Sequence, residues 1–349
     1  MEYRIGLIGC GTVGQGFLEI LEKKRYYLAE NLGFRAKVVA ISDMLKGSLL
    51  EPHGIDLAKL LSILNRRRKI DEYLEGKPNP AEGMDPIEMI ETSDADIIAE
   101  LTYTNIQTGE PATSYIRKAF QSRKHVVTSN KGPAALYYEE LKTLAHKNNV
   151  LFRIEGTVMS GTPVFHLFEN GLEANEIMEI KGILNGTTNF ILTKMEEEDM
   201  DYEEALKLAQ QKGYAEADPS ADVEGYDALA KIIILSNVLL GANLKPADVR
   251  REGISSISKK DVQEALASGM RYKLIASAIK EKDKVRAAVL PQKLPLSDSL
   301  AGVMGANNAL SFDLDLMGKV TIQGAGAGKI ETGYSILSDM LAIHRRLSK

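Results

Sequence analysis

The sequence predicts an α/β protein with a doubly wound parallel sheet in its N-terminal half and a second domain of α+β type. Up to about residue 155, apolar strand-like segments alternate with helical ones, and a glycine-rich turn follows the first strand. Beyond that point the alternation is lost. Strands that are apolar throughout and alternate with helices are typical of a parallel sheet covered on both faces.

The first domain is expected over residues 1–155. Its expected strands and helices alternate along the chain as "YRIGLIG", a helix from about Gly14, "AKVVAISD", "DADIIAELTY", a helix near 110–121, "HVVTSN", a helix near 133–147 and "VLFRIEG". Between Asp43 and Asp94 the pattern loosens into an insertion rich in Pro, Gly and charge. Its segment "IDLAKLLSILNRRRK" is typical of an amphipathic helix that ends in a basic cluster.

The second domain is expected over residues 156–319. It begins with a strand, "EIMEIKGIL", and a helix, "TTNFILTKM"; further on come the helices "DYEEALKLAQQKG" and 221–242 and the strands "RYKLIASAIK" and "VRAAVLP". In the first of these later helices, Asp201 and Glu204 have the spacing of a capping box and Gly213 is placed as the helix stop. The last segment, about 320–349, is expected to return to the first domain.

Composition excludes several functional classes. With 349 residues, 44% of them hydrophobic, the chain is long enough for two cores. A net charge of −5 gives no electrostatic reason to expect nucleic acid or an anionic membrane as partner. The N-terminus lacks the pattern of a secretory signal, and Cys10 is the only cysteine, so a cytoplasmic protein without internal disulfides is expected. The five histidines lack metal-ligand spacing.

The glycine-rich turn "GCGTVG" predicts a dinucleotide site. Gly9, Gly11 and Gly14 follow a strand and open a helix in the G-x-G-x-x-G register, with Thr12 and Val13 between them. These glycines permit the tight turn, the approach of a pyrophosphate and the close contact of helix and strand, while the helix N-terminus attracts the anion. The alternative is a tight strand-to-helix turn alone. This register in its βαβ setting indicates a Rossmann-type domain.

Asp43 ends the second strand, where a carboxylate can accept hydrogen bonds from the ribose hydroxyls of NAD. Lys46 and the run from Arg66 to Lys69 could instead reach the extra phosphate of NADP, although a solvated helix end is the simpler role for the run. The sequence therefore leaves the choice between NAD and NADP open.

Asp227 and Lys231 are unusual because they stand four residues apart in a helix that is otherwise apolar almost all the way round. Residues at this spacing share one helix face, and a charge on such a helix is costly to bury without a partner or ligand. The pair is therefore expected to meet a partner, a metal or a ligand. An ordinary surface ion pair is the alternative.

Several motifs in one order resemble those of homoserine dehydrogenases over essentially the whole chain. They are "GCGTVG", "VVTSNKGP" (126–133), "EGTVMSGTP" (155–163), "GILNGTTNFILTKM" (182–195), "GYAEADPSADVEGYDALAK" (213–231) and "GAGAG" (324–328). The resemblance implies NAD(P)-dependent interconversion of L-homoserine and L-aspartate 4-semialdehyde, in the pathway to threonine and methionine. It also implies that the second domain is catalytic and forms a homodimer.

The resemblance assigns roles to particular residues. Lys231 matches the proton donor, Glu216 and Asp227 match residues that hold the zwitterionic substrate, and Lys131 matches a second active-site lysine that could touch substrate, nicotinamide or the reacting oxygen. Two ammonium groups close together would lower each other's pKa, and the sequence does not decide which lysine moves the proton. The remaining cofactor contacts that the resemblance implies are Thr102, Gly213, Glu216, Gly326 and Gly328.

A cation site is also implied. A carboxylate together with loop carbonyls suits sodium or another cation that prefers oxygen ligands. The family site maps onto Glu155 and the backbone of Val158, Ser160 and Thr162; without the resemblance, this stretch would be interpreted as a turn with a surface Glu. By contrast, Asn185, Thr187, Thr188 and Asn189 are expected to cap and turn rather than to catalyse.

The sequence leaves two rival functions open. One is another NAD(P)-dependent amino-acid or semialdehyde reductase on the same scaffold, and the other is a non-catalytic NAD(P)-binding sensor protein. The chain stops soon after "GAGAG", so no appended regulatory domain, no fused kinase and no inhibition by threonine through such a domain are expected.

Overall fold

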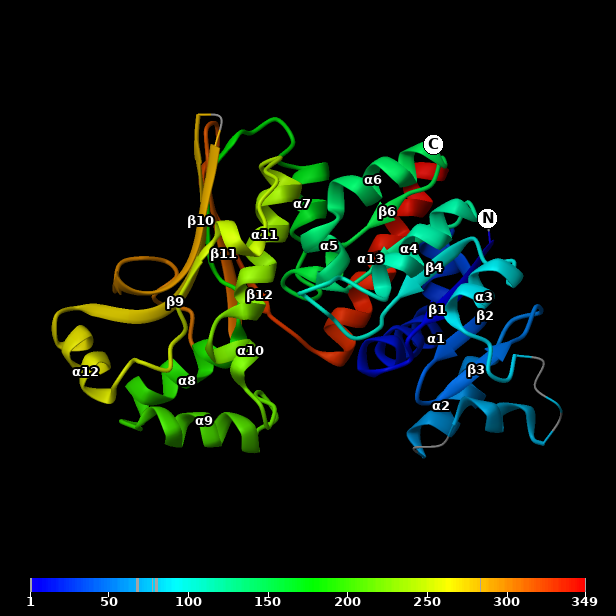
Figure 1. Ribbon diagram of the computed structural model, residues 1–349, viewed down its shortest axis with the longest axis horizontal. Coiled ribbons are helices and arrows are strands. Elements are labelled where there is room, and N and C mark those ends of the chain that lie inside the picture. The colour runs from blue at the N-terminus through cyan, green and yellow to red at the C-terminus, as the bar shows by residue number, and fades with distance from the viewer. Residues whose placement is uncertain (1, 67–68, 77, 79–80, 283, 349) are drawn as a thin grey trace. The chain divides into compact units, whose positions relative to one another are not determined.

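The structure is a computed structural model that describes residues 2–66, 69–76, 78, 81–282 and 284–348. The chain divides into two compact units (Figure 1). Unit 1 contains residues 1–161 and 328–349, and unit 2 contains residues 162–327. No helix in the described part of the chain is both long and apolar enough to cross a membrane.

The strands described in unit 1 form one six-stranded sheet with the order β3-β2-β1-β4-β5-β6. The strands of the sheet, in chain order, are β1 (Glu2–Ile8), β2 (Arg35–Asp43), β3 (Gly47–Leu50), β4 (Ile97–Glu100), β5 (His125–Thr128) and β6 (Phe152–Arg153). Neighbouring strands are parallel except that β3 pairs antiparallel with β2. The predicted doubly wound sheet is confirmed, and it carries one antiparallel edge strand that was not predicted, because the short β2–β3 connection allows a hairpin but no crossover.

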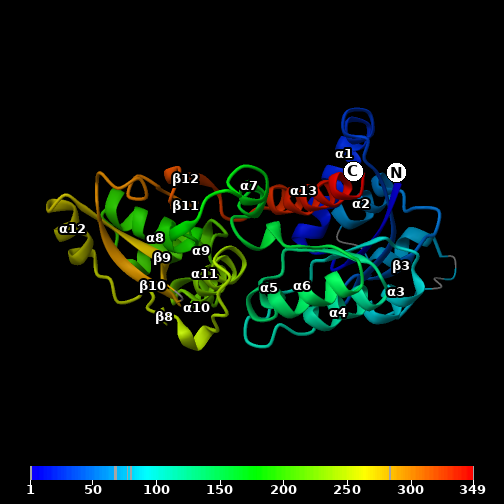
Figure 2. The same ribbon diagram turned by 90° about the horizontal axis from the view of Figure 1, so that it is seen from above.

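Helices cover both faces of this sheet (Figure 2). α1, α2 and α13 share a buried cluster with one face, and α3, α4 and α6 share a second cluster with the other. The helical elements of unit 1 are α1 (Thr12–Leu32), α2 (Leu57–Asn65), the 3-10 turn η1 (Ile70–Leu74), α3 (Pro86–Thr92), α4 (Ala112–Gln121), α5 (Lys131–Leu136), α6 (Tyr138–Lys147), η2 (Glu155–Thr157) and α13 (Lys329–Leu347). Of the basic run expected after α2, Arg67 and Arg68 lie outside the described residues.

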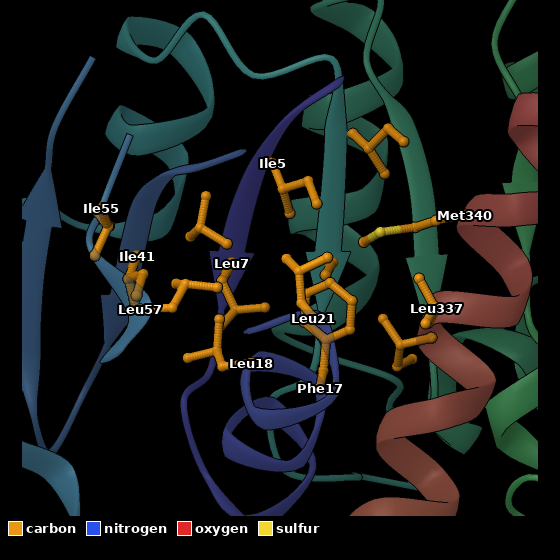
Figure 3. Close-up of a cluster of buried hydrophobic side chains, with 14 of the residues drawn as sticks. Ile5, Leu7, Phe17, Leu18, Leu21, Ile41, Ile55, Leu57, Leu337 and Met340 are labelled. Atoms are coloured by element: carbon orange, nitrogen blue, oxygen red, sulfur yellow. The ribbon is translucent and has the colours of Figure 1, made fainter. Parts of the chain in front are cut away.

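Figure 3 shows the first cluster, in which Phe17, Leu18 and Leu21 of α1 pack with strand residues such as Leu7 and with Met340 of α13. Glycines bring the two helices into close contact. A Cβ on Gly16 would lie 1.9 Å from the carbonyl oxygen of Lys329. The last helix of the chain therefore completes the core of unit 1.

The strands described in unit 2 form a second six-stranded sheet with the order β12-β11-β7-β9-β10-β8. Its pairs are antiparallel except for β8 with β10. The strands are β7 (Ile177–Ile183), β8 (Arg250–Arg251), β9 (Met270–Glu281), β10 (Lys284–Pro295), β11 (Asn307–Leu314) and β12 (Gly318–Ala325). The helices are α7 (Phe165–Asn170), α8 (Gly186–Glu197), α9 (Tyr202–Gln211), α10 (Ser220–Val223), α11 (Tyr226–Leu239), the 3-10 turn η3 (Pro246–Asp248) and α12 (Lys259–Ala267).

Candidate active site

The glycine-rich turn joins β1 to α1 at the carboxyl edge of the first sheet. Gly9 has a φ of 89°, and a Cβ there would lie 2.5 Å from the carbonyl oxygen of Leu101 on the neighbouring strand's extension. A Cβ on Gly14 would lie 2.7 Å from the carbonyl oxygen of Gly9, whereas the space beside Gly11 is open. Helix α1 begins at Thr12, so its first backbone N–H groups face this opening. The turn therefore fits a pyrophosphate.

Asp43 lies at the end of β2 and next to the glycine-rich turn. Its Oδ2 accepts a hydrogen bond from the backbone N–H of Cys10 at 2.7 Å, and its Oδ1 accepts from the N–H groups of Leu45 and Lys46 at 3.0 and 2.9 Å. The Lys46 ammonium lies 4.0 Å from the same carboxylate. These contacts fix the carboxylate beside the turn, at the position where a ribose would lie.

The ends of β4 and β5 bring together a group of polar side chains. Thr102 donates its backbone N–H to Oε1 of the buried Glu100 at 3.0 Å, and its hydroxyl donates to the same oxygen. Asn130 caps α5 by accepting the N–H of Gly132, and Lys131 follows it, half-buried, as the first residue of that helix. Thr102 and Lys131 thus stand at the carboxyl edge of the sheet, where open α/β sheets bind ligands.

In unit 2, the Asp227–Lys231 pair is largely buried. Only 5% of Lys231 is exposed, and its Nζ donates to Oδ2 of Asp227 at 2.7 Å and to the carbonyl oxygen of Leu184 at 2.6 Å. The alternative of a surface ion pair is therefore wrong for the lysine. An ammonium has three hydrogens, and within the described residues two of them are used by these acceptors.

Asn185 and Asp222 extend this pair and were not singled out as site residues from the sequence. Asn185 caps α8 by accepting the N–H of Thr188 at 2.9 Å, and its Nδ2 donates to Asp222 Oδ1 at 2.6 Å and to Asp227 Oδ2 at 3.0 Å. Burial raises the pKa of Asp222, and the neighbouring charge of Asp227 adds to this rise. The capping role expected of Asn185 is confirmed, and the amide also holds two acidic side chains together.

The loop after α9 is less closely tied to this cluster. Gly213 adopts a φ of 75°, and Thr187 of α8 donates its hydroxyl to the carbonyl oxygen of Tyr214 at 2.7 Å. The side chain of Glu216 is exposed, and within the described part of the chain no hydrogen bond or ion pair reaches its carboxylate. The structure thus groups Asp227 with Lys231 but does not bring Glu216 into their network.

The "GAGAG" turn spans the boundary of the two units. Gly326 belongs to unit 2 and lies against the buried side chain of Asn308, so that a Cβ there would clash with the amide at 2.4 Å. Gly328 belongs to unit 1, has a φ of 152° and is the N-cap residue of α13.

The loop from Glu155 fits a cation by its chemistry. Glu155 is only 2% exposed and donates its backbone N–H to Oδ2 of the buried Asp339 at 2.9 Å, so two buried carboxylates share this region of unit 1. Val158 is buried as well, and Ser160, with a φ of 54°, is in the left-handed region, which turns the loop carbonyls sharply. Thr162, the remaining expected ligand, begins unit 2. A positive ion would compensate such buried acids.

These features define a class of protein. The chain combines a dinucleotide-binding turn on a doubly wound sheet with a buried ammonium, which the described residues leave one hydrogen to donate, and with acids able to hold a cationic group. This combination is typical of a nicotinamide-dependent oxidoreductase that acts on a small polar substrate.

Comparison with known proteins identifies the family. Residues 9–155 match the family model described as homoserine dehydrogenase, NAD binding domain, and residues 163–341 match the model described as homoserine dehydrogenase. The chain is 42% identical to an NAD(+)-dependent homoserine dehydrogenase of Pseudomonas canavaninivorans over 100% of this chain and 98% of the relative. It is also 42% identical to a homoserine dehydrogenase of Methanocaldococcus jannaschii, over 98% and 99% of the two chains.

Solved structures agree. A putative homoserine dehydrogenase from Archaeoglobus fulgidus superposes with a TM-score of 0.85 at 37% identity, covering 98% of this chain and 99% of that chain. A hyperthermophilic archaeal homoserine dehydrogenase in complex with NADPH gives a TM-score of 0.83 at 29% identity, covering 99% and 98%. The chain belongs to the homoserine dehydrogenase family. It is an NAD(P)-dependent oxidoreductase that interconverts L-homoserine and L-aspartate 4-semialdehyde, a step in the biosynthesis of threonine and methionine.

Proposed function

We propose that Lys231 is the residue that gives a proton to the aldehyde oxygen of aspartate semialdehyde and takes it back from homoserine. The observation that carries this proposal is its geometry: Leu184 and Asp227 accept two of its hydrogens and hold the ammonium in place. The third hydrogen is then available to the substrate oxygen, where charge develops as the carbonyl is reduced. The nicotinamide supplies the hydride.

The acidic side chains around Lys231 suit the ammonium group of the substrate. Asp227 accepts from both Lys231 and Asn185, and Asp222 is held next to it by the same amide. We assign Asp227 to substrate binding, with Asp222 as a further candidate. Glu216, on its exposed loop, is proposed to contact substrate and cofactor when they bind, which would order that loop. Lys131 is proposed to act on the same substrate or on the nicotinamide.

We propose that unit 1 is the dinucleotide-binding domain and unit 2 the catalytic and dimerisation domain. The glycine-rich turn, with Asp43 and Thr102, belongs to the former, and the Asp227–Lys231 pair to the latter. Gly213, Gly326 and Gly328 are proposed as further cofactor contacts. The space beside Gly213 is open, which would let a ligand approach its backbone closely.

NAD is the proposed preferred coenzyme. The support is the Asp43 carboxylate, which would face a 2′-phosphate unfavourably, and the name of the Pseudomonas relative, which is NAD(+)-dependent. The NADPH complex of the archaeal relative and the nearby Lys46 are the arguments against it.

The test of the activity mixes purified protein with L-homoserine and either NAD⁺ or NADP⁺ and follows the absorbance of the reduced coenzyme. We expect turnover with both and a higher kcat/KM with NAD⁺. Turnover with neither would refute the function, while a higher kcat/KM with NADP⁺ would refute only the coenzyme preference.

A monovalent cation such as sodium is proposed at Glu155, with the carbonyl oxygens of Val158, Ser160 and Thr162. Thermal melting in sodium chloride and in choline chloride at equal ionic strength tests this. Sodium should raise the melting temperature of the wild type and have less effect on Glu155→Gln, because binding to the folded state stabilises it by mass action. Equal melting temperatures of the wild type in the two salts would contradict a sodium site at Glu155.

A homodimer in the cytoplasm is the proposed state of the protein. Unit 2 exposes Leu316 and Met317 at the turn between β11 and its edge strand β12, and apolar groups of this kind are common at contacts between subunits. Light scattering that gives the mass of one chain at micromolar concentration would contradict the dimer. Fractionation of the host cell tests the location.

A further inference from the structure

Glu100 is a buried carboxyl group to which the proposed reaction gives no role. It is the last residue of β4, it has an exposed fraction of 0%, and it lies two residues before Thr102. Its Oε1 accepts from the backbone N–H and the hydroxyl of Thr102, and its Oε2 lies 2.9 Å from the hydroxyl oxygen of Thr128 on the neighbouring strand.

A count of hydrogens indicates which group donates in the contact between Glu100 and Thr128. The hydroxyl of Thr128 lies 2.8 Å from the backbone carbonyl oxygen of Glu100 and 2.9 Å from Oε2, and both are acceptors when the carboxyl is ionised. A hydroxyl has one hydrogen, which can serve only one acceptor well. The same hydroxyl oxygen accepts the N–H of Asn130 at 2.9 Å.

A proton on Oε2 resolves this conflict. The hydroxyl of Thr128 then donates to the carbonyl oxygen of Glu100 and accepts from Oε2–H and from the N–H of Asn130, so every lone pair and hydrogen of that hydroxyl is used. Oε1, as a carbonyl-type oxygen, still accepts twice from Thr102. Every contact in the group is then satisfied.

The surroundings of Glu100 favour the same protonation state. Burial raises the pKa of this carboxyl, and the influences that oppose the rise are hydrogen bonds from Thr102, Thr128 and Asn130, which are neutral groups. A buried carboxyl group without a compensating cation keeps its proton because ionisation in a low-dielectric interior is costly.

The contact with Oε1 of Glu100 also sets the orientation of the Thr102 hydroxyl. Because that hydroxyl donates its hydrogen to Oε1, its oxygen remains an acceptor, and the one donor that reaches it among the described residues is the Asn130 amide, at a long 3.4 Å. A carboxamide NH₂ is a donor that would match such an acceptor. The nicotinamide ring of the coenzyme carries such a group.

We propose that Glu100 is a neutral carboxylic acid and a positioning residue, which holds the Thr102 hydroxyl as a hydrogen-bond acceptor for the carboxamide of nicotinamide. The inference rests on the proposed contact of Thr102 with the nicotinamide end of the coenzyme. It concerns only groups of unit 1, and it is independent of the substrate.

Infrared difference spectroscopy at neutral pH tests the protonation directly. Subtracting the spectrum of Glu100→Gln from that of the wild type should leave the C=O stretch of a protonated carboxyl group. The matched control is Glu91→Gln, which changes an exposed carboxylate that is paired with Lys118, and it should instead remove ionised carboxylate bands. Ionised carboxylate bands in the Glu100 difference spectrum would overturn the proposal.

Binding of NADH and of ADP-ribose, which lacks the nicotinamide, tests the positioning role. Gln can accept from Thr102 and donate to Thr128 as the neutral acid does, so Glu100→Gln should bind NADH within about threefold of the wild type. Glu100→Leu should lose NADH affinity about fivefold or more, the effect of one missing oriented hydrogen bond, and should keep its affinity for ADP-ribose.

Three results would overturn the positioning role: unchanged NADH affinity in Glu100→Leu, equal losses in the Gln and Leu variants, or a parallel loss of ADP-ribose affinity. If the Leu variant does not fold, Thr102→Val provides the same comparison of the two ligands. This variant should bind NADH more weakly and ADP-ribose as the wild type does. Unchanged NADH affinity would refute the inference. Failure of the wild type to oxidise L-homoserine would refute the proposed reaction but leave these outcomes untouched.

Discussion

At the scale of single residues, Lys231 shows how a charge is kept inside an apolar helix. Desolvation of an ammonium costs several kcal/mol unless hydrogen bonds and an opposite charge replace the lost water. Here Asp227 supplies the charge and the carbonyl oxygen of Leu184 supplies a second acceptor. The lysine is held rigidly as a result, which is what a proton donor requires.

Replacing Lys231 by Ala should lower kcat for homoserine oxidation by about 100- to 10,000-fold, the usual contribution of a positioned proton donor. Binding of NADH should change by less than about threefold, because the dinucleotide turn belongs to unit 1. Stopped-flow absorbance measures the first quantity and a fluorescence titration the second. Near-normal turnover in a folded variant would show that another group, such as Lys131, transfers the proton.

Asp222 should make folding stability depend on pH. Its pKa in the folded state is raised above 3.8, so the folded protein binds this proton more tightly than the unfolded chain does. Its contribution to stability is therefore present below pH 3.8 and is lost as pH rises through the raised pKa. Asn keeps the acceptor for Asn185 without ionising. The stability of Asp222→Asn relative to wild type should accordingly increase from pH 3 to pH 7.

Urea denaturation at a series of pH values measures this difference. A matched control is Asp218→Asn, because Asp218 is exposed and hydrogen bonds from Ser220 lower its pKa. The stability of this variant relative to wild type should therefore decrease, rather than increase, as pH rises. A difference between Asp222→Asn and wild type that stays constant with pH would show that Asp222 has the same pKa in both states.

At the scale of secondary-structure elements, β9 places a second buried lysine in unit 2. Lys273 is 1% exposed and donates to Oδ1 of Asn189 at 2.8 Å and to the carbonyl oxygen of Val303 at 2.5 Å. The Asn189 amide in turn donates to the carbonyl oxygens of Val303, Gly305 and Asn307. The strand and helix α8 thereby hold the loop that leads into β11.

Burial lowers the pKa of Lys273 to about 8, and the charge of Arg271 contributes in the same direction. The unfolded chain binds this proton more tightly, up to its ordinary pKa of 10.5. Below pH 8 the buried lysine is charged and the fold carries the whole cost of burying that charge. Between pH 8 and 10.5 the folded protein loses this proton while the unfolded chain keeps it, so the free energy of unfolding should increase, by a few kcal/mol at most.

Comparison of Lys273→Met with the wild type isolates this contribution. The free energy of unfolding of the wild type relative to the variant should rise between pH 8 and pH 10, measured by guanidinium denaturation. Lys280→Met is the control, since Lys280 lies on the same strand but is exposed and pairs with Glu176. If the difference in unfolding free energy between wild type and Lys273→Met does not change with pH, the lysine keeps its ordinary pKa in the folded protein.

At the scale of the whole molecule, the chain leaves unit 1, builds unit 2 from a continuous segment and then returns as α13. The returning helix buries four large apolar side chains in the unit 1 core, and Lys329 at its start pairs with Glu19 of α1 at 2.6 Å. These buried side chains are Ile336, Leu337, Met340 and Ile343.

Deletion of residues 328–349 should therefore unfold unit 1. Burial of an aliphatic side chain contributes about 1.5–3 kcal/mol, so four of them account for roughly 6–12 kcal/mol, as much as the whole stability of a typical domain. The truncated protein should be insoluble or fail to bind NADH. Unit 2, whose segment 162–327 is continuous, should keep its helical circular dichroism when expressed alone. Normal NADH binding by the truncated chain would contradict this account.

Local patterns in the sequence predicted much of this molecule. The alternation of apolar strands and helices predicted the α/β class, and the register of Gly9, Gly11 and Gly14 predicted the turn between β1 and α1, since both depend on neighbours in the chain. The four-residue spacing of Asp227 and Lys231 predicted a shared helix face, and the ion pair forms there. The roles in catalysis, cofactor binding and cation binding remain predictions.

Other parts of the site could not be predicted locally, because each joins segments far apart in sequence. Nothing near Asn185 in the chain indicates that it donates to Asp222 and Asp227, and nothing near Glu155 indicates that Asp339 will lie beside it. The pairing of β4 with β5 alone brings Thr128 to Glu100. The antiparallel edge strand β3 was missed because its hairpin falls in the irregular insertion.

The sequence by itself determined the order of the elements, the dinucleotide-binding turn and the family, because these are set by the period of apolar residues, by glycine positions and by motifs that are contiguous in the chain. Only the tertiary structure decided which polar side chains are buried together and which hydrogen bonds they form. Those properties depend on desolvation and on hydrogen bonds between segments that meet only after the chain has folded.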